Sequence, residues 1–561
     1  MQCLLWVSLS DGGKFWHISD LHLDYEYVPG GDSRHFCHQS DSNQTEEWVG
    51  PLGNYSCDSP FLLVESSLQA MQRHQPEPDF IVWTGDSAPH WRDPQPPDQN
   101  YITNVTKFVF SRLDKMFPNI PVVPALGNHD SSPPDQFPIS VNNSHQEYYK
   151  TLWSDGAFGD HVESQDTFLQ CGYHSKTIQS VSGLNMTFLV LNTNIYYHDN
   201  FTTEGDKDPC GQLSWLEKSL KNVDEDKEKV FIVAHVPPGS FERSPGKLNF
   251  NSPPDTFKDI NDRYIEIVSR PDNSRKISAH LYGHLHTDTF RILLDGATRT
   301  TPVGVAFMAA SVTPILWVQN KVVGVNPTIR LMEYNDNGIL LDYTTYYLDL
   351  KKQFEQGPSS NNEGPENRRT NAKFLNHDMN NKSRTADETL KTNASESLYD
   401  VYWKPLYSAR ETYKLENISA SSMFQAYVQM VKAEGDSFSQ YYKFNTGSNE
   451  AGSCDQSCVR NHLCTISNLV LRELSSCLAN DDSSINYYYR TSGEQNMSTT
   501  TKAVKTSTEA MTLPTTMSTT STISGDHNEN DHSHDSPLDH EETPTSTENE
   551  VTIEKIEVSN N

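Results

Sequence analysis

Positive charge is scarce in this sequence. Lysine and arginine together number 44 in 561 residues, against 74 aspartates and glutamates, so the formal net charge is −30. A nucleic-acid polymer or an anionic membrane would meet a repulsive surface, because both carry dense negative charge. The composition argues against nucleic-acid binding as a main role and leaves small molecules as the expected partners.

Long apolar runs are also missing. No segment reaches the length of a transmembrane helix, and the last residues lack the apolar tail that is exchanged for a lipid anchor. Residues 3–9 are apolar but too short for a good secretory signal, and no lysine or arginine precedes them. We interpret residues 1–13 as a residual or truncated signal segment.

Cysteine is sparse, with nine residues, and no Cys-x-x-Cys pair suggests a zinc knuckle. Without Cys3, an even number remains, which suits the disulfide bonds of an exported protein. Ten Asn-x-Ser/Thr sequons favour a glycosylated protein that is secreted to the extracellular space or the lysosome. They lie at Asn43, Asn54, Asn104, Asn142, Asn185, Asn200, Asn381, Asn393, Asn417 and Asn496.

Five short polar clusters each follow a short apolar run with the pattern of a buried strand. The runs are residues 15–19, 80–84, 122–126, 230–234 and 280–282. The clusters are Asp20-Leu21-His22, Gly85-Asp86, Gly127-Asn128-His129-Asp130, His235 and Gly283-His284-Leu285-His286. Ligands of open α/β sheets bind beyond the carboxyl ends of the strands, so we expect the five clusters to converge.

These side chains suit a pair of divalent metal ions. Imidazole favours zinc or iron, while carboxylate and amide oxygens also accept manganese. One carboxylate can bridge two ions about 3.5–4 Å apart, the separation used for in-line displacement at phosphorus. Each cluster alone has a structural explanation, since Asp-x-His is typical of a turn and a single buried histidine is commonly part of the core. Their ordered combination predicts a two-metal phosphoesterase site.

The clusters resemble those of the calcineurin-like metallophosphoesterases. Four longer segments look like acid sphingomyelinase and its relatives, and among these the type 3 phosphodiesterases, especially the b form, are the most similar. The resemblance extends over residues 14–477 and is interrupted by one long insertion. The four segments are Phe-Trp-His-Ile-Ser-Asp-Leu-His-Leu-Asp at 15–24, Cys-Asp-Ser-Pro at 57–60, Trp-Thr-Gly-Asp-Ser-Ala-Pro-His at 83–90 and Leu-Asn-Thr-Asn at 191–194.

The resemblance implies two zinc ions, although the ligands also fit manganese or iron. It assigns Asp20, His22 and His286 to the first ion, Asn128, His235 and His284 to the second, and Asp86 as the bridge. A metal-bridging hydroxide would attack phosphorus directly. His90 and His129 would face the phosphate, one of them stabilising charge or protonating the leaving oxygen; which one stays open. We expect Asp130 to orient His129, with a helix cap as the alternative.

The resemblance also implies three disulfide bonds, Cys37–Cys57, Cys454–Cys458 and Cys464–Cys477, with Cys171 and Cys210 left as a fourth pair. Its fold class is α/β: a metallophosphoesterase β-sandwich flanked by helices, followed by a small disulfide-linked helical C-terminal domain and a disordered tail. We place the catalytic domain at residues 14–350, a polar disordered insertion at 351–400, the helical domain at 401–485 and a Ser/Thr-rich acidic tail at 486–561.

Three later runs, residues 305–310, 328–334 and 339–347, should complete the sheets, and residues 423–432 and 463–478 should be helices. Trp403 is either a buried residue of the helical domain or a substrate contact. Four histidines of the tail could bind metal loosely, but a solvated tract explains them better; they are His527, His532, His534 and His540.

These observations favour a secreted, monomeric, two-zinc phosphodiesterase. Because no lipid-extracting saposin module precedes the first strand, we expect soluble substrates such as nucleotides and nucleotide-choline conjugates rather than bilayer lipid. The alternatives are a sphingomyelin phosphodiesterase with membrane lipid as its partner, a phosphomonoesterase, and a non-catalytic surface modulator of lipid signalling. The intact ligand set argues against the last.

Overall fold

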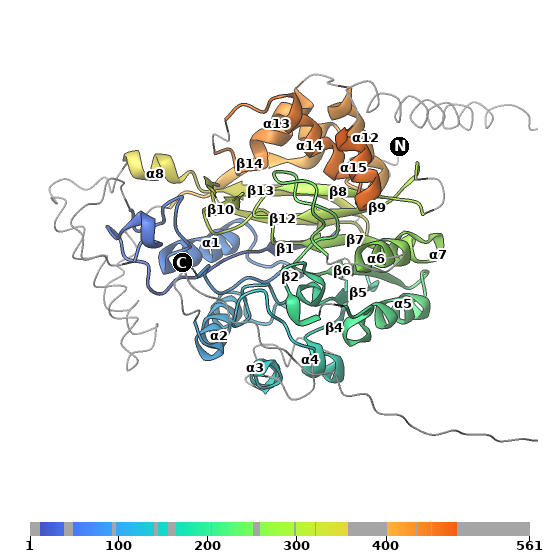
Figure 1. Ribbon diagram of the computed structural model, residues 1–561, viewed down its shortest axis with the longest axis horizontal. Coiled ribbons are helices and arrows are strands. Elements are labelled where there is room, and N and C mark those ends of the chain that lie inside the picture. The colour runs from blue at the N-terminus through green and yellow to red at the C-terminus, as the bar shows by residue number, and fades with distance from the viewer. Residues whose placement is uncertain are drawn as a thin grey trace, which may run out of the picture. The chain divides into compact units, whose positions relative to one another are not determined.

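The computed structural model describes residues 12–38, 49–91, 97–139, 144–154, 164–180, 182–203, 205–250, 259–296, 299–319, 321–356, 401–432, 436–449 and 452–479. All of them belong to one compact unit within Met1–Thr499. Two six-stranded sheets lie at its centre (Figure 1). Residues 351–356, predicted as the start of a disordered insertion, instead belong to a helix, α8 (Leu350–Gln356). The rest of that insertion, residues 357–400, and the acidic tail with its four histidines lie outside the described residues.

The first sheet has the order β14-β13-β12-β1-β2-β3. Its strands are β1 (Lys14–Ile18), β2 (Phe80–Trp83), β3 (Val122–Pro124), β12 (Thr328–Tyr334), β13 (Leu340–Tyr347) and β14 (Lys404–Ser408). Strands β1, β2 and β3 are parallel, and the other three continue the sheet in antiparallel pairs. The parallel strands bring three carboxyl ends to one edge.

The second sheet has the order β4-β5-β6-β7-β9-β8. Its strands are β4 (His174–Gln179), β5 (Asn185–Val190), β6 (Glu228–Val233), β7 (Ile277–Tyr282), β8 (Thr289–Leu294) and β9 (Pro302–Met308). From β5 to β9 neighbouring strands are parallel, and only the two outer strands run antiparallel to their neighbours. A separate hairpin joins β10 (Ile315–Val318) to β11 (Lys321–Gly324).

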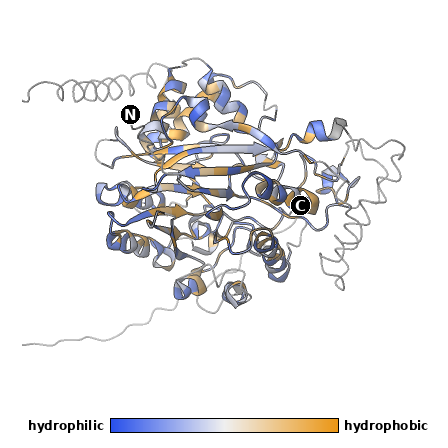
Figure 2. Ribbon diagram, turned by 180° about the vertical axis from the view of Figure 1, so that it is seen from behind, coloured by the Kyte–Doolittle hydropathy of each residue, from blue (hydrophilic) through white to orange (hydrophobic). Residues whose placement is uncertain are grey.

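Side chains of the strands alternate between two cores. Phe15 and Phe80 stack between the sheets with ring centroids 4.5 Å apart, and Phe231 meets Phe15 edge-on. The next residue of β1, Trp16, faces the other way into the core beneath the helices. Burial of both faces explains why these strands contain apolar residues on both sides, and in Figure 2 the central strands carry orange segments between blue and white ones.

Helices cover the outer faces of the sheets (Figure 1). Val64 and Leu68 of α1 share a core with Trp16 and Ile81, because residues four apart lie on one helix face. The helices up to residue 356 are α1 (Phe61–His74), α2 (Gln99–Met116), α3 (Ser144–Ser154), α4 (Gln165–Cys171), α5 (Gln212–Asn222), α6 (Ile260–Ser269), α7 (Pro271–Ser274) and α8 (Leu350–Gln356). Short 3-10 helices occur at Ser33–His35, Thr193–Tyr196, Phe201–Thr203 and Pro209–Gly211.

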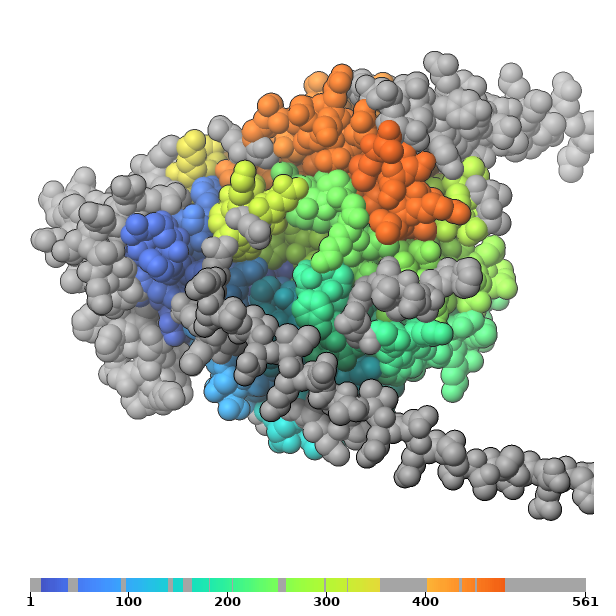
Figure 3. Space-filling view, viewed as in Figure 1, coloured from blue at the N-terminus to red at the C-terminus, as the bar shows by residue number. Residues whose placement is uncertain are grey.

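A group of C-terminal helices packs on β8 and β9, as Figure 3 shows for the orange segment beside the green one. It consists of α11 (Ala409–Tyr413), α12 (Ala420–Val431), α13 (Ser437–Phe444), α14 (Gln456–Ser467) and α15 (Leu471–Ala479). Met423 and Leu463 enter the core that Phe290 and Phe307 line, so this region closes the second sheet rather than forming a separate core.

Two expectations for the C-terminal region have clear outcomes. A single helix over residues 463–478 is wrong: α14 ends at Ser467 and α15 begins at Leu471. The break falls at Asn468, whose backbone is extended and whose side-chain amide donates to the carbonyl of Cys464, the hydrogen bond of a residue leaving a helix. Trp403 is 1% exposed and donates to Ser66 Oγ, which confirms the buried alternative.

Four disulfide bonds are present: Cys37–Cys57, Cys171–Cys210, Cys454–Cys458 and Cys464–Cys477. They are the three pairs that the resemblance implied and the fourth left over. No helix among the described residues is long and apolar enough to cross a membrane.

Candidate active site

The five predicted clusters meet where strands of both sheets end. The loops after β1, β2 and β3 come from the first sheet, and those after β6 and β7 come from the second. Backbone hydrogen bonds tie them together, from Asp20 N–H to the carbonyl of Gly85 (3.1 Å) and from Gly283 N–H to the carbonyl of His235 (3.1 Å). The site therefore lies across the junction of the two sheets, and neither sheet supplies it alone.

Asp86 lies at the middle of the cluster. Its Oδ2 atom is 3.2 Å from Nε2 of His22 and 3.2 Å from Nε2 of His235. Its Oδ1 accepts a hydrogen bond from the backbone N–H of His129 at 2.8 Å, which fixes the carboxylate. One oxygen thus faces two imidazoles from opposite sheets.

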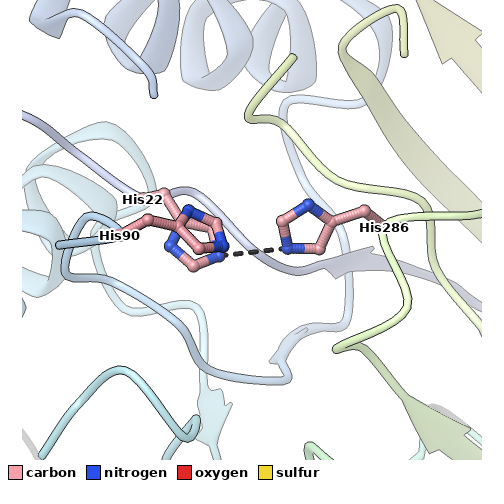
Figure 4. Close-up of side chains that lie close together, drawn as sticks. All are labelled: His22, His90 and His286. Carbon is pink, nitrogen blue, oxygen red and sulfur yellow. Dashed lines mark hydrogen bonds between the residues drawn. The ribbon is translucent and has the colours of Figure 1, made fainter. Parts of the chain in front are cut away.

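The remaining ligand-type atoms divide between the two sides of Asp86. On one side, His286 Nε2 lies 3.1 Å from His22 Nε2, as the dashed line in Figure 4 marks, and 3.4 Å from Asp20 Oδ1. On the other side, Asn128 Oδ1 lies 2.8 Å from His235 Nε2 and 2.8 Å from His284 Nδ1.

This donor set fits two metal ions. Two imidazole nitrogens 3.1 Å apart repel one another unless a proton or a cation lies between them. Asp20, His22, Asp86 and His286 each offer an atom within 4.8 Å of the others, and all four are buried. Histidine nitrogen with carboxylate and amide oxygen is a donor set for borderline divalent ions.

Three of the histidines have a fixed orientation. The Nδ1 atom of His22 lies 2.8 Å from the carbonyl of Ala88, that of His235 lies 2.7 Å from Thr84, and that of His286 lies 2.6 Å from Ile315. A carbonyl can only accept, so each Nδ1 carries a proton, and Nε2 is the nitrogen left to bind a metal ion.

Electrostatics in the cluster favour a negatively charged centre. Burial opposes the charge of Asp86, but the charges of His235 and His22 outweigh it and hold the pKa of Asp86 well below its usual range. Burial likewise opposes protonation of His22 and His235, yet the neighbouring Asp86 raises the pKa of each imidazole to about 9. The pocket without metal therefore retains positive charge beside Asp86, the same sign that a cation would bring.

Five of the seven clustered residues have left-handed backbones. The φ angles are 52° at Asp20, 41° at His22, 56° at Asp86, 71° at His284 and 55° at His286. A non-glycine residue in this region costs on the order of 1–3 kcal/mol and persists only where its surroundings enforce it. Space is equally restricted at Gly127, where a Cβ atom would lie 2.0 Å from Asp86 Oδ1.

Asp130 does not have the role that the sequence suggested. Its carboxylate accepts backbone hydrogen bonds from Gly127 (2.8 Å), Asp86 (3.1 Å) and Ser87 (2.9 Å). Among the described residues it makes no hydrogen bond to His129, and no helix begins there, so both the orienting role and the helix cap are wrong. Asp130 joins the turn after β3 to the turn after β2; burial and the charge of Asp86 raise its pKa to about 6.

His90 and His129 lie beside the ligand cluster. The His90 ring stacks on His22 with centroids 4.1 Å apart, as Figure 4 shows, and its centroid is 4.4 Å from that of His129. Burial, and then the charge of His90, place the pKa of His129 well below its usual range. Within the described part of the chain, Nδ1 of His129 has no hydrogen-bond partner.

Asp58 is a functional candidate to which the sequence alone gave no role. Its Oδ1 lies 2.9 Å from His90 Nδ1 and accepts a hydrogen bond from Thr313 Oγ1 at 3.0 Å, and its Oδ2 accepts from the His90 backbone N–H at 2.7 Å. Burial opposes its charge, but His90 lowers its pKa to about 2. The segment Cys57-Asp58-Ser59-Pro60 was part of the family resemblance, and that was the available signal.

The sequons fall into three groups. Asn104 is exposed, and Asn185 and Asn417 are partly exposed. Asn54 and Asn200 are only 2% and 0% exposed, so a glycan on either is incompatible with this packing and both are withdrawn as acceptors. The others lie outside the described residues: Asn43, Asn142, Asn381, Asn393 and Asn496.

Comparison with known proteins agrees with this geometry. The calcineurin-like phosphoesterase family matches residues 13–288, and the acid sphingomyelin phosphodiesterase C-terminal region matches residues 372–484. Human acid sphingomyelinase-like phosphodiesterase 3b is 32% identical over 84% of this chain and 90% of its own. Human cyclic GMP-AMP phosphodiesterase SMPDL3A is 31% identical over 83% and 90%, and sphingomyelinase phosphodiesterase C of Dictyostelium discoideum is 30% identical over 83% and 92%.

Two sheets that surround one central carboxylate with histidines, aspartate and asparagine at their carboxyl ends define a calcineurin-like metallophosphoesterase, a fold family that implies a binuclear metal site. Within that class the chain belongs to the acid sphingomyelinase-like phosphodiesterases, as its 32% identity to a member over most of both chains shows. It is a phosphoric diester hydrolase.

Proposed function

We propose that this protein is a secreted two-zinc phosphodiesterase that hydrolyses soluble phosphodiesters and nucleotide phosphoanhydrides. The observation that carries the proposal is the position of Asp86 Oδ2, 3.2 Å from an imidazole of each sheet. A carboxylate so placed suits the shared ligand of two ions. Four disulfide bonds and the exposed sequon at Asn104 support an exported protein.

We assign the metal ligands by the side of Asp86 on which they lie. Asp20, His22 and His286 would hold one ion, Asn128, His235 and His284 the other, and Asp86 both. Histidine predominates among them, which favours zinc. When bound, the metal pair supplies Lewis acidity at the phosphoryl oxygen and an activated water.

His90 is our candidate for the proton donor to the leaving oxygen. Its Nδ1 is engaged by Asp58, so its Nε2 is the nitrogen that reaches the site, and the carboxylate stabilises the imidazolium form. Burial lowers the pKa of both imidazoles, but His90 has a hydrogen-bonded carboxylate that opposes this shift, whereas His129 has none. We assign His129 to hydrogen bonding of the phosphate oxygens.

The substrate class is tested with purified, metal-loaded protein at about pH 5, where imidazole is protonated in part. We expect turnover of nucleotides, nucleotide-choline conjugates and cyclic dinucleotides to exceed that of sphingomyelin micelles. Cyclic dinucleotides are included among the test substrates because one relative carries the name cyclic GMP-AMP phosphodiesterase. Preference for sphingomyelin would reverse this ranking.

Metal analysis separates the enzyme from a non-catalytic modulator of lipid signalling. Elemental analysis of the purified chain should give two zinc ions. Fewer than one ion per chain, with no hydrolysis after zinc is added, would instead support a binding role.

A further inference from the structure

The side-chain amide of Asn128 is bound at both ends. Its Oδ1 lies 2.8 Å from His235 Nε2 and 2.8 Å from His284 Nδ1, while its Nδ2 donates to Asp135 Oδ1 at 2.8 Å. Asn128 is only 3% exposed, so water cannot replace these partners freely. An asparagine amide has two similar ends, and only one of them can bind a cation.

Asp135 is connected to Asn128 a second time through the backbone. The N–H of Asp135 donates to the carbonyl of Asn128 at 2.9 Å. Asp135 has a φ of 70°, a left-handed conformation that is uncommon for a residue other than glycine, asparagine or aspartate. The backbone contact and this conformation aim the carboxylate at the Asn128 side chain.

We propose that Asp135 is the positioning residue for Asn128: it fixes the amide so that only the oxygen faces the second metal position. The inference rests on the proposed two-metal function. Asp135 itself touches neither ion and acts through the Asn128 amide.

The chemistry of the amide gives this contact its strength. A cation that binds Oδ1 withdraws electrons from the amide and makes its N–H groups more acidic. A carboxylate accepts such hydrogen bonds more strongly than a neutral group does. Removing an outer partner of this kind lowers metal affinity about 10–100-fold.

The test measures metal binding rather than turnover. Asp135→Leu and Asp135→Asn are titrated with zinc against a competing chelator, and folding without metal is checked by circular dichroism. We expect Asp135→Leu to bind one of its two ions about 10–100-fold less tightly and the other unchanged. Asp135→Asn keeps an oxygen acceptor, so its loss should be under about tenfold.

Asp199→Asn is the matched control. Asp199 is charged and close enough to raise the pKa of Asp135, but its partners are His198 and Lys247 rather than Asn128. Its removal should leave both affinities unchanged. Equal weakening in Asp199→Asn and Asp135→Leu would overturn the proposal, because the effect would then be general electrostatics.

A reciprocal exchange adds a test that does not depend on Asp135→Leu folding. Asn128→Asp alone places two carboxylates together, whereas Asn128→Asp with Asp135→Asn restores one N–H donor between them. The double variant should bind the ion at the Asn128 position more tightly than Asn128→Asp does. Additive losses would contradict the proposal. If the unaltered protein binds fewer than two ions, the proposed function fails instead.

Discussion

Asn445 Nδ2 lies 3.0 Å from Glu242 Oε1, so a residue from the C-terminal helices satisfies a buried carboxylate that follows the His235 loop. Glu242 also accepts from Thr287 Oγ1 (2.8 Å) and from Arg291 Nη2 (2.6 Å). Thr287 follows His286 directly. The C-terminal region is therefore hydrogen-bonded to both histidine-bearing loops of the second sheet.

Replacing Asn445 should weaken this connection strongly. Asn445→Leu leaves hydrogen-bonding groups of Glu242 and Arg243 without their partner, and such a loss costs about 2–4 kcal/mol. Denaturant unfolding measures the change. Asn449→Leu is the control, because Asn449 donates one bond to the carbonyl of Gly324 in a partly buried place. Its cost should be about 1 kcal/mol. Equal destabilisation by the two variants would contradict a special role for Asn445.

Acid should destabilise the fold through Glu242. Burial opposes its charge, but Arg291 lowers the pKa of this carboxyl to about 2, below its unfolded value. The folded state thus gains stability above the unfolded pKa and loses it as pH falls toward 2. Glu242→Gln removes this contribution, of roughly 2–3 kcal/mol. The free energy of unfolding of the unaltered protein and of Glu242→Gln is measured at pH 7 and pH 3. The difference between the two proteins should be smaller at pH 3. A difference that does not change with pH would refute the linkage.

His129 and Asp86 should separate chemistry from metal binding. His129→Ala leaves the ligand atoms in place, so the protein should keep two ions while losing most phosphodiesterase activity. Asp86→Ala removes the shared carboxylate and should lose metal as well. Elemental analysis measures the bound metal of each variant, and a turnover assay measures its phosphodiesterase activity. A fully active, metal-loaded His129→Ala protein would disprove the role of His129.

Asp58 should matter most when the leaving group is poor. A proton donor helps an alkoxide to leave but contributes little for nitrophenolate, which departs without a proton. Asp58→Asn should therefore lower kcat about 10²-fold for a nucleoside alkyl diester and much less for a nitrophenyl diester. His90→Ala should show the same selectivity. Equal losses on both substrates would point to a structural role for Asp58.

Glycan occupancy should follow burial. In protein secreted from animal cells, mass spectrometry should find a glycan on Asn104 and none on Asn200. Both Nδ2 protons of Asn200 are donated, to the carbonyls of Phe137 and Asn194 at 3.1 Å each. Asn104→Gln should reduce the mass by one glycan, whereas Asn200→Gln should leave the mass of attached glycan unchanged. A glycosylated Asn200 would mean that this packing is not the folded state.

The strand ends were predictable because they depend on local pattern. Residues 328–334 were predicted as a strand and form β12 over the same range. The five strands that precede the ligand-type residues also end within two residues of the predicted ends. Partners of the carboxylates were not predictable. Asp130 reaches the backbone of Asp86, 44 residues away, and Asp58 reaches His90 across 32. Such contacts depend on loop conformations that no residue pattern records.

The left-handed backbones of Asp20, His22, Asp86, His284 and His286 have a consequence for how this protein can diverge. Glycine and asparagine adopt that conformation at little cost, so at the three histidine positions, His22, His284 and His286, selection for stability and selection for the ligand oppose each other. A gene copy released from catalysis should drift first toward glycine or asparagine there, and toward β-branched residues last. Inactive paralogues would then be recognisable by small residues at the ends of intact strands.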